Sequence, residues 1–421
     1  MATKEKQKRT PQQKKKIAGK VLLGILIALL CIIAIITAIN TICVASCKNY
    51  IKSINPVSYS SQLTPEEKND YTTFVTDNDF MVMQLSDVHI GAGFMSVKKD
   101  NQAINAVAAM VAEEKPDLVI VTGDIAYPVP FQAGTFNNKT GAVIFASLME
   151  KLGVYWCPAF GNHDTEAYSY FSREDISELY SNRQKYPHCL FQSGPKDVDG
   201  YGNYIVNVQT SKGEITQSFV MLDSHSYIDN DYFGIMWKYD CVHKNQVEWY
   251  EQQIKTLTKI NNNKTPKSLM FFHMPPQEML TAYNEYKENG YKDTADSKYI
   301  GGKAGEKDLV VYPSEKNYGL FDKCLELGST KGIFFGHDHL NNFTILYKGI
   351  QLTYDYTVDY LAYVGINKYG TQRGCTMITT KPDGSFVSKA ENYYQDKYTP
   401  QMEKETVTME DFYTDEEKGH K

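Results

Sequence analysis

Histidine and aspartate side chains occur two residues apart at two places in this chain, each time at the end of a short apolar run. Asp87 and His89 close "MQLSDVH", and His337 and His339 close "FFGHDH", with Asp338 between them. Residues two apart on an extended chain project to the same side, so we expect each pair to reach one place. Imidazole and carboxylate donors together suit borderline metals such as Mn, Fe, Zn or Co better than Ca or Mg.

Three further polar clusters follow other apolar runs. Asp124 comes directly after Gly123, Asn162 stands in "GNHD", and His273 ends "SLMFFH". Each of these alone has a plainer explanation as a turn residue or a helix cap, but their co-occurrence favours a metal site. Seven donors are too many for one ion and suit two ions that share a bridging carboxylate, which can clamp both oxygens of a phosphoryl displacement. The candidate metal ligands are Asp87, His89, Asp124, Asn162, His273, His337 and His339.

The polar clusters lie at the ends of runs that we expect to be strands covered on both faces, because they are almost continuously apolar. These runs are residues 80–89, 116–124, 154–164, 218–225, 268–274 and 332–339. Helical spacing of apolar residues predicts helices over 101–114, 244–260 and 318–327. Strands alternating with helices predict an α/β fold, in which ligands gather beyond the carboxyl ends of the strands. After residue 340 the Tyr-, Thr- and Gly-rich sequence is typical of antiparallel strands.

The ordered set "DVH", "GD", "GNHD", "FFHM" and "GHDH" resembles the calcineurin-like metallophosphoesterase superfamily and covers residues 80–345. The segments "LDSHSY", "FFHMPP" and "GHDHLNNF" are similar to its small, single-domain, purple-acid-phosphatase-like branch. The resemblance implies a two-layered β-sandwich flanked by helices. It also implies two divalent or trivalent metal ions, Mn, Fe or Zn, and a phosphate-ester substrate whose phosphorus is attacked by a metal-bound hydroxide.

The same resemblance implies a role for each matching residue. Asp87, His89 and His339 would hold the first metal, Asn162, His273 and His337 the second, and Asp124 would bridge the two. His163 would protonate the leaving oxygen as a general acid, and Asp164 would orient His163 and keep it cationic.

Two segments depart from the family's pattern. "GDIAY" places Tyr127 where true purple enzymes have an iron-binding tyrosine, but His89 fills that coordination position, so we expect Tyr127 to lie beside the ligands or to serve the fold. Residues 353–365 replace a Gly-rich segment, and a substrate therefore cannot be transferred from the family.

The N-terminal region predicts a membrane anchor. Residues 21–47 contain no charged residue, and a helix of that length crosses a hydrocarbon core of roughly 30 Å. Residues 1–20 carry a net charge of +7, which places the N-terminus in the cytoplasm and the body of a single-pass cell-membrane protein outside it. "VASC" at 44–47 also resembles a lipobox that would make Cys47 a lipidated N-terminus, although the long apolar run favours an uncleaved signal anchor.

We therefore expect five regions: a basic cytoplasmic tail (1–20), a transmembrane anchor (21–47), a stalk (48–77), a catalytic domain (78–400) and an acidic C-terminal tail (401–421). The chain beyond residue 20 has a net charge of −13, compared with −6 for the whole chain. This acidic charge argues against a nucleic-acid-binding surface. The predicted function is a membrane-anchored phosphoric ester hydrolase. Two alternatives stay open: a strict phosphodiesterase acting on nucleotides, lipid head groups or wall polymers, and a non-catalytic scaffold. The oligomeric state is left open.

Overall fold

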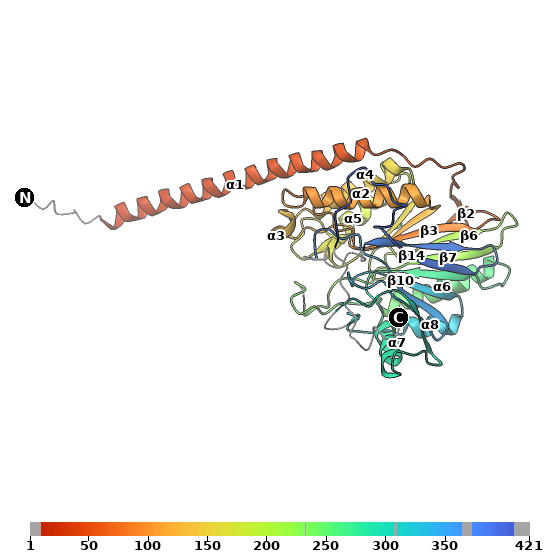
Figure 1. Ribbon diagram of the computed structural model, residues 1–421. Coiled ribbons are helices and arrows are strands. Elements are labelled where there is room, and N and C mark those ends of the chain that lie inside the picture. The colour runs from red at the N-terminus through yellow and green to blue at the C-terminus, as the bar shows by residue number, and fades with distance from the viewer. Residues whose placement is uncertain (1–9, 232, 307–309, 364–372, 408–421) are drawn as a thin grey trace, which may run out of the picture.

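Two β-sheets face each other in the computed structural model of the protein, and helices cover the outer side of each sheet (Figure 1). The structure describes residues 10–231, 233–306, 310–363 and 373–407. The smaller sheet has the strand order β14-β13-β3-β4-β5, and the larger has the order β1-β2-β6-β7-β8-β10-β12-β11-β9. This arrangement confirms the predicted α/β sandwich flanked by helices.

The smaller sheet consists of β3 (Phe80–Leu85), β4 (Leu118–Thr122), β5 (Trp156–Ala159), β13 (Gly374–Thr380) and β14 (Phe386–Asn392). The larger sheet consists of β1 (Glu66–Lys68), β2 (Tyr71–Val75), β6 (Tyr204–Gln209), β7 (Ile215–Met221), β8 (Lys267–Phe271), β9 (Ser297–Gly301), β10 (Thr330–Phe335), β11 (Thr344–Tyr347) and β12 (Ile350–Tyr354). The helices are α1 (Pro11–Ser53), α2 (Val97–Glu114), α3 (Pro130–Ala133), α4 (Asn138–Leu152), α5 (Arg173–Tyr180), α6 (Lys244–Ile260), α7 (Gln277–Glu288) and α8 (Leu320–Leu327), with a 3₁₀ turn η1 (His163–Thr165).

Parallel strands dominate the centre of both sheets. β3, β4 and β5 pair in parallel in the smaller sheet, and β7, β8, β10 and β12 do so in the larger. The segments after residue 340 pair antiparallel as expected, β11 with β12 and β13 with β14. Because parallel strands bring their carboxyl ends to one edge, the two sheets present two rows of loops at the same end of the sandwich.

The core between the sheets is aromatic. The rings of Phe80 and Phe219 stack at 5.9 Å and join β3 of the smaller sheet to β7 of the larger, and those of Phe271 and Phe334 stack at 5.2 Å within the larger sheet. On the far side of the larger sheet, α6 buries Tyr250, near the end of its second turn, together with Val247, Ile254 and Leu257 on the same face. Its apolar spacing is the reason that the sequence predicted its bounds, 244–260, correctly.

Helix α1 is long and apolar enough to cross a membrane, with a mean hydropathy of 3.2 over its most apolar 18 residues and none of that window buried. Figure 1 shows it projecting from the body beside α2 and α4. Its final turns, however, pack on the body: Cys47 is 1% exposed and Ile51 is 3% exposed. The predicted anchor over 21–47 therefore continues without a break into a helical segment that belongs to the folded body.

The region 48–77 differs from the stalk that its polar sequence predicted. Residues 66–75 form β1 and β2, and β2 pairs in parallel with β6, with Thr72, Thr73 and Phe74 buried. β2 pairs with β1 on one side and with β6 on the other, and these backbone hydrogen bonds stabilise it, so polar side chains such as threonine do not exclude a strand. Of the predicted acidic tail, Glu405 forms an ion pair with Arg373 at 2.8 Å, and residues 408–421 lie outside the described residues.

Candidate metal centre

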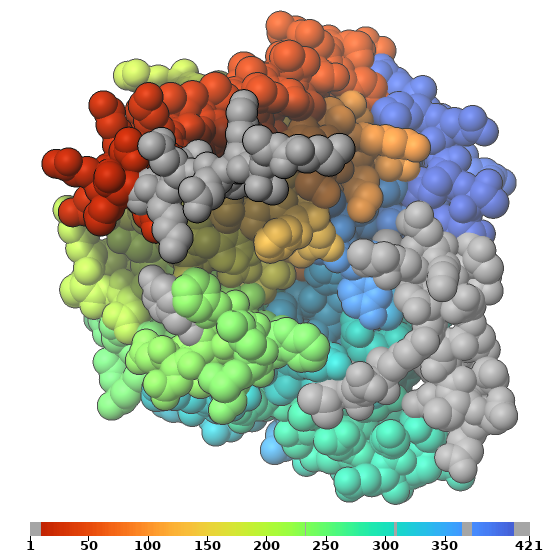
Figure 2. Space-filling view, turned by 90° about the vertical axis from the view of Figure 1, so that its left-hand side faces the viewer, coloured from red at the N-terminus to blue at the C-terminus, as the bar shows by residue number. Residues whose placement is uncertain are grey.

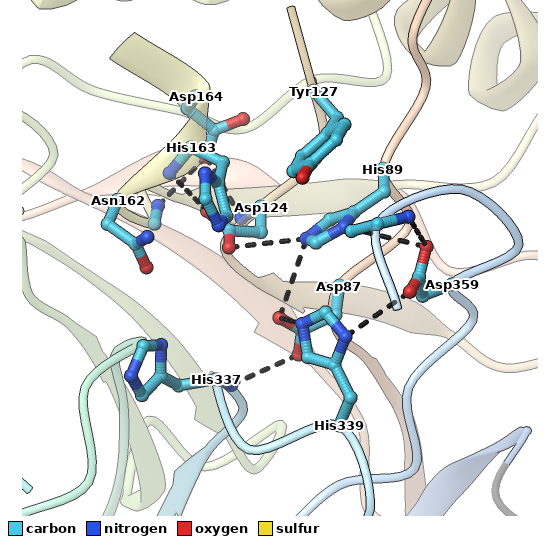
Figure 3. Close-up of polar contacts among 12 residues, drawn as sticks. Asp87, His89, Asp124, Tyr127, Asn162, His163, Asp164, His337, His339 and Asp359 are labelled. Atoms are coloured by element: carbon cyan, nitrogen blue, oxygen red, sulfur yellow. Dashed lines mark hydrogen bonds and ion pairs between the residues drawn. The ribbon is translucent and has the colours of Figure 1, made fainter. Parts of the chain in front are cut away.

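All seven predicted ligands meet at the edge where the carboxyl ends of both sheets converge. Asp87 and His89 follow β3, Asp124 follows β4 and Asn162 follows β5, so the smaller sheet supplies four. The larger sheet supplies His273 after β8 and His337 and His339 after β10. Figure 3 shows the labelled members of this group pointing toward one another from separate loops. We call Asp87, His89 and His339 the first ligand set, and Asn162, His273 and His337 the second.

The local backbone that presents these ligands is not extended. Asp87, His89 and Asp124 have φ values of 52°, 53° and 52°, and His337 has a φ of 77°. These are left-handed conformations, which side chains other than glycine rarely adopt, and they are held by neighbouring segments. The His89 N–H, for example, donates to the Asp124 carbonyl at 3.0 Å. The expected convergence is present, but it comes from tight turns after the strands and not from the pleat of an extended chain.

Two glycines allow the loops to approach closely. A Cβ atom on Gly336 would lie 1.7 Å from Ser86 Oγ and 2.5 Å from Asp87 Oδ2. A Cβ atom on Gly161 would lie 2.1 Å from Asp124 Oδ1. Distances this short are impossible, so a side chain at either position would push a ligand-bearing loop out of the centre.

The first ligand set surrounds a carboxylate oxygen with two ring nitrogens. Asp87 Oδ1 lies 3.3 Å from His339 Nε2 and 3.8 Å from His89 Nε2. That oxygen is buried and has no hydrogen-bond partner among the described residues. One ligand atom from each of the three residues lies within 4.8 Å of the others. A cation fits here, since it would satisfy a buried oxygen that accepts no hydrogen bond from the described residues and would bind two imidazoles at once.

Asp124 lies between the two ligand sets. Its Oδ2 is 3.2 Å from His89 Nε2 and also 3.2 Å from His273 Nε2. His273 Nε2 is in turn 3.1 Å from Asn162 Oδ1, and the His273 and His337 rings are 5.2 Å apart. One carboxylate oxygen thus lies beside a histidine of each set, so Asp124 connects the two sets.

Asp359 is a member of the site that the sequence did not reveal. Its Oδ2 lies 3.2 Å from His339 Nδ1, and its Oδ1 lies 3.5 Å from His89 Nδ1. It is fully buried, and three consecutive backbone N–H groups, those of Leu361, Ala362 and Tyr363, donate to it. The carboxylate therefore holds both rings of the first ligand set by their outer nitrogens and leaves Nε2 of each facing Asp87. The only available signal was that residues 353–365 depart from the family's pattern.

Charge balance in the centre couples carboxylates to imidazoles. Burial lowers the pKa of His89, but Asp359 and Asp124 outweigh it and raise the pKa to about 9. Burial likewise lowers the pKa of His273, while Asp124 raises it to about 9. For His337, burial and the neighbouring His273 lower the pKa well below its usual value, which keeps this imidazole neutral. The carboxylates thus keep protons on the rings of His89 and His273. A bound cation would displace those protons.

The histidine of "GNHD" has a different partner from the one expected. His163 Nδ1 lies 2.6 Å from Glu166 Oε1, whereas Asp164 accepts hydrogen bonds from the backbone N–H groups of Asp124, Ala126 and Gly161 at 3.0, 2.9 and 2.8 Å. The prediction that Asp164 orients His163 is therefore wrong, and Glu166 has that position. The reason is the 3₁₀ turn η1, which begins at His163 and is capped by Glu166; side chains three residues apart lie over each other in such a turn. Asp164 instead ties the loop after β5 to the loop after β4.

Three tyrosines line the centre without replacing its ligands. The Tyr127 ring stacks on His89 at 4.8 Å, and its hydroxyl donates to Gln132 at 2.6 Å, so Tyr127 lies beside the ligands as expected. Tyr227 Oη accepts a hydrogen bond from the Asn162 side-chain amide at 3.0 Å, and the Tyr239 ring lies 4.2 Å from that of His337. Tyr227 and Tyr239 also pair through an antiparallel bridge at the base of one loop.

The chain is similar to two plant proteins. "Probable inactive purple acid phosphatase 14" from Arabidopsis thaliana is 30% identical over 308 residues, covering 67% of this chain and 71% of that protein. "Probable inactive purple acid phosphatase 29" from the same plant is 26% identical over 328 residues, covering 72% and 77%. The predicted resemblance to purple-acid-phosphatase-like proteins is confirmed by these relatives.

A crystal structure of a dimetal phosphatase from Danio rerio aligns with a TM-score of 0.44 and 13% identity, over 74% of this chain and 99% of that one. The profile of the calcineurin-like phosphoesterase family matches residues 80–341, a range that begins with β3 and includes every predicted metal ligand. With the family profile covering more than half of its length, the chain belongs to the calcineurin-like phosphoesterase family.

Proposed function

We propose that the protein is an active, membrane-anchored phosphoesterase with two metal ions. The observation that carries this proposal is the position of Asp124 Oδ2, 3.2 Å from a histidine of each ligand set. A carboxylate so placed supports two ions that share it, with the first ligand set on one and the second on the other. Ions held in this way would supply positive charge and would activate a water for attack on the phosphorus of a phosphate ester.

The chain's own residues supply the remaining chemistry. Glu166 accepts the Nδ1 proton of His163 and leaves Nε2 as the ring atom that can donate a proton to the departing oxygen. The His163 backbone N–H also donates to Asp124 Oδ1 at 2.8 Å, which fixes the proton donor relative to the bridging carboxylate. Tyr227 fixes the amide of Asn162 so that the oxygen of that amide faces His273.

The location forms part of the same proposal. Helix α1 anchors the protein as a single-pass span, with the basic N-terminus in the cytoplasm and the catalytic body outside. Protease treatment of intact cells that carry a C-terminal epitope tests this orientation: the epitope is lost if the body is outside. Survival of the epitope in intact cells and its loss after permeabilisation would reverse the orientation.

A non-catalytic scaffold is the alternative that the relatives' names raise, since both are called probable inactive enzymes. In this chain, however, the two ligand sets, Asp124 and His163 are all present and lie together. The full-length protein assayed with p-nitrophenyl phosphate and bis-p-nitrophenyl phosphate, with and without Mn²⁺, separates the candidates. Turnover of the diester alone would select the strict phosphodiesterase, and bound metal without turnover of either ester would select the scaffold.

A further inference from the structure

Two apolar segments flank the metal centre on the face from which α1 projects. Figure 2 views that face directly, with α1 in red, the region of α3 in orange-yellow and the segment between Tyr227 and Tyr239 in light green. In Figure 1 the same green segment extends to the side on which α1 leaves the body. Both segments also connect to the metal centre through their bases.

On one side, α3 is joined to the first ligand set. Gln132 of α3 accepts the hydroxyl proton of Tyr127, which stacks on His89, and its amide donates to the Ala362 carbonyl at 3.0 Å, three residues after Asp359. The neighbouring Phe131 is nevertheless 87% exposed. An aromatic side chain this exposed, next to a residue that contacts the metal centre, is not packed in the core.

On the other side, the loop from Tyr227 to Tyr239 is joined to the second ligand set through the two tyrosines at its base. Its tip carries Ile235, Met236 and Trp237, which are 79%, 52% and 68% exposed. Two apolar projections are thus joined to the metal centre, one to each ligand set.

The spacing along α1 places these projections relative to a bilayer. The uncharged residues between Lys20 and Asn40 number nineteen, and a helix of that length rises about 28 Å, close to the roughly 30 Å of a hydrocarbon core. Asn40 then lies at the outer boundary of the core. There its amide donates to the Gly134 carbonyl at 3.1 Å, just after α3, and its oxygen accepts the Phe94 N–H at 2.8 Å.

Apolar surface continues from the span onto the body at this level. A cavity of about 780 Å³ is lined by Ile33 and Ile36 of α1 together with Phe94, Phe136 and Tyr170 of the body. Phe94, Phe136 and Tyr170 are 42%, 38% and 67% exposed. Aromatic side chains concentrate at the boundary between hydrocarbon and water, because their rings are apolar and their edges tolerate water.

We propose that this face rests on the outer surface of the bilayer that α1 spans, with Phe131 and Trp237 immersed in the interfacial layer. The metal centre then opens toward the lipid head groups, and its substrates are phosphate esters carried by membrane lipids. The choice of substrate class rests on the proposed function, whereas the docking of the face does not.

Trp237 is a natural reporter of the docking. Trp156 is fully buried, Trp249 packs partly against the core, and α1 contains no tryptophan. The full-length protein is reconstituted in vesicles of phosphatidylcholine and phosphatidylglycerol, with or without lipids brominated in the upper acyl chain. We expect bromine to quench a fraction of the emission, and that fraction to disappear in Trp237→Phe. Equal quenching of the wild type and Trp237→Phe would overturn the docking.

A paired variant removes one exposed apolar side chain from each segment while keeping the reporter. Phe131→Ser with Ile235→Ser should reduce the quenching of Trp237 at least threefold. Val387→Ser is the matched control, because Val387 is 57% exposed but pairs with Thr379 opposite Met81, at the end of the smaller sheet away from the ligands. Equal loss of quenching in the control would overturn the assignment of the two segments.

The substrate class is tested by comparing phosphatidic acid and phosphatidylglycerol in vesicles with their deacylated, water-soluble counterparts. We expect kcat/KM at least tenfold higher for the lipid form of the ester that the enzyme accepts, and this preference should shrink in the Phe131→Ser, Ile235→Ser protein. Equal hydrolysis of soluble and lipid forms would overturn the substrate class. No hydrolysis of any ester, with Trp237 quenched and metal bound, would overturn the proposed function while supporting the docking.

Discussion

Glu166 Oε1, at the C-terminal cap of the 3₁₀ turn η1, lies 2.6 Å from the Nδ1 atom of His163, three residues earlier. The contact fixes which ring nitrogen carries a proton toward the protein and which one is left for the substrate. It gives this histidine the orientation that a general acid needs, from a residue two positions beyond the "GNHD" motif.

Replacing Glu166 by Gln should lower kcat by roughly tenfold to a hundredfold while leaving metal content unchanged, because His163 loses its charged partner but no ligand is touched. The loss should be smaller than for His163→Ala, expected at about 10²–10⁴-fold. Steady-state kinetics and elemental analysis of the two variants check this. A Glu166→Gln enzyme with wild-type kcat would show that the contact does not serve the reaction.

Asp164→Ala is the matched comparison for Glu166. It leaves the buried N–H groups of Asp124, Ala126 and Gly161 without their acceptor. Each unsatisfied N–H group lowers the free energy of unfolding by about 1–3 kcal/mol. We expect a clear drop in the free energy of unfolding, measured by denaturant titration, whereas Glu166→Gln should unfold almost as the wild type does. The reverse pattern would restore the original assignment of Asp164.

Asp124→Ala should lose both metal ions, since the carboxylate reaches a histidine of each ligand set. Asn162→Ala removes a donor of the second set alone and should keep the ion of the first set. Metal stoichiometry after dialysis distinguishes the two. A single ion retained at full occupancy in Asp124→Ala would contradict the bridge.

Asp359→Asn should weaken binding of the ion in the first ligand set by about 10–100-fold, because both His89 and His339 lose the carboxylate that orients them. Asp355→Asn is the control: Asp355 is also a buried carboxylate on this segment, but it accepts a hydrogen bond from Thr376 at 2.7 Å. Competition with a chelator of known affinity measures the difference. Equal weakening in both variants would assign the effect to the loop as a whole.

Metal affinity should rise with pH until it levels off near pH 9. The pKa values of His89 and His273 are raised to about 9 by their carboxylate neighbours, so at neutral pH an incoming ion must displace protons from both rings. Calorimetric titrations in buffers of different protonation enthalpy count those protons. The Asp359→Asn protein should release fewer protons when the metal binds, since Asp359 is the main cause that raises the pKa of His89. Affinity that does not change between pH 7 and 9 would contradict this coupling.

The sequence determined the types of ligand and the strands that carry them. An apolar run followed by a polar cluster is a local pattern, and the bounds of β3, β4, β8, β10 and α6 follow closely from it. The seven ligands could be named because each lies at the end of such a run. Their mutual distances could not, because left-handed turns at Asp87, His89, Asp124 and His337 set them.

Only the tertiary structure placed Asp359 and Glu166 beside the histidines and joined β2 to the larger sheet. Asp359 comes 270 residues after His89 along the chain, so no spacing rule connects them, and the contact exists because β12 lies parallel to β10 and directs the following segment over the first ligand set. The polar segment around Thr72 becomes a strand because β6 offers it backbone partners. Local composition fixes which elements can form, whereas pairing between distant segments decides which side chains meet.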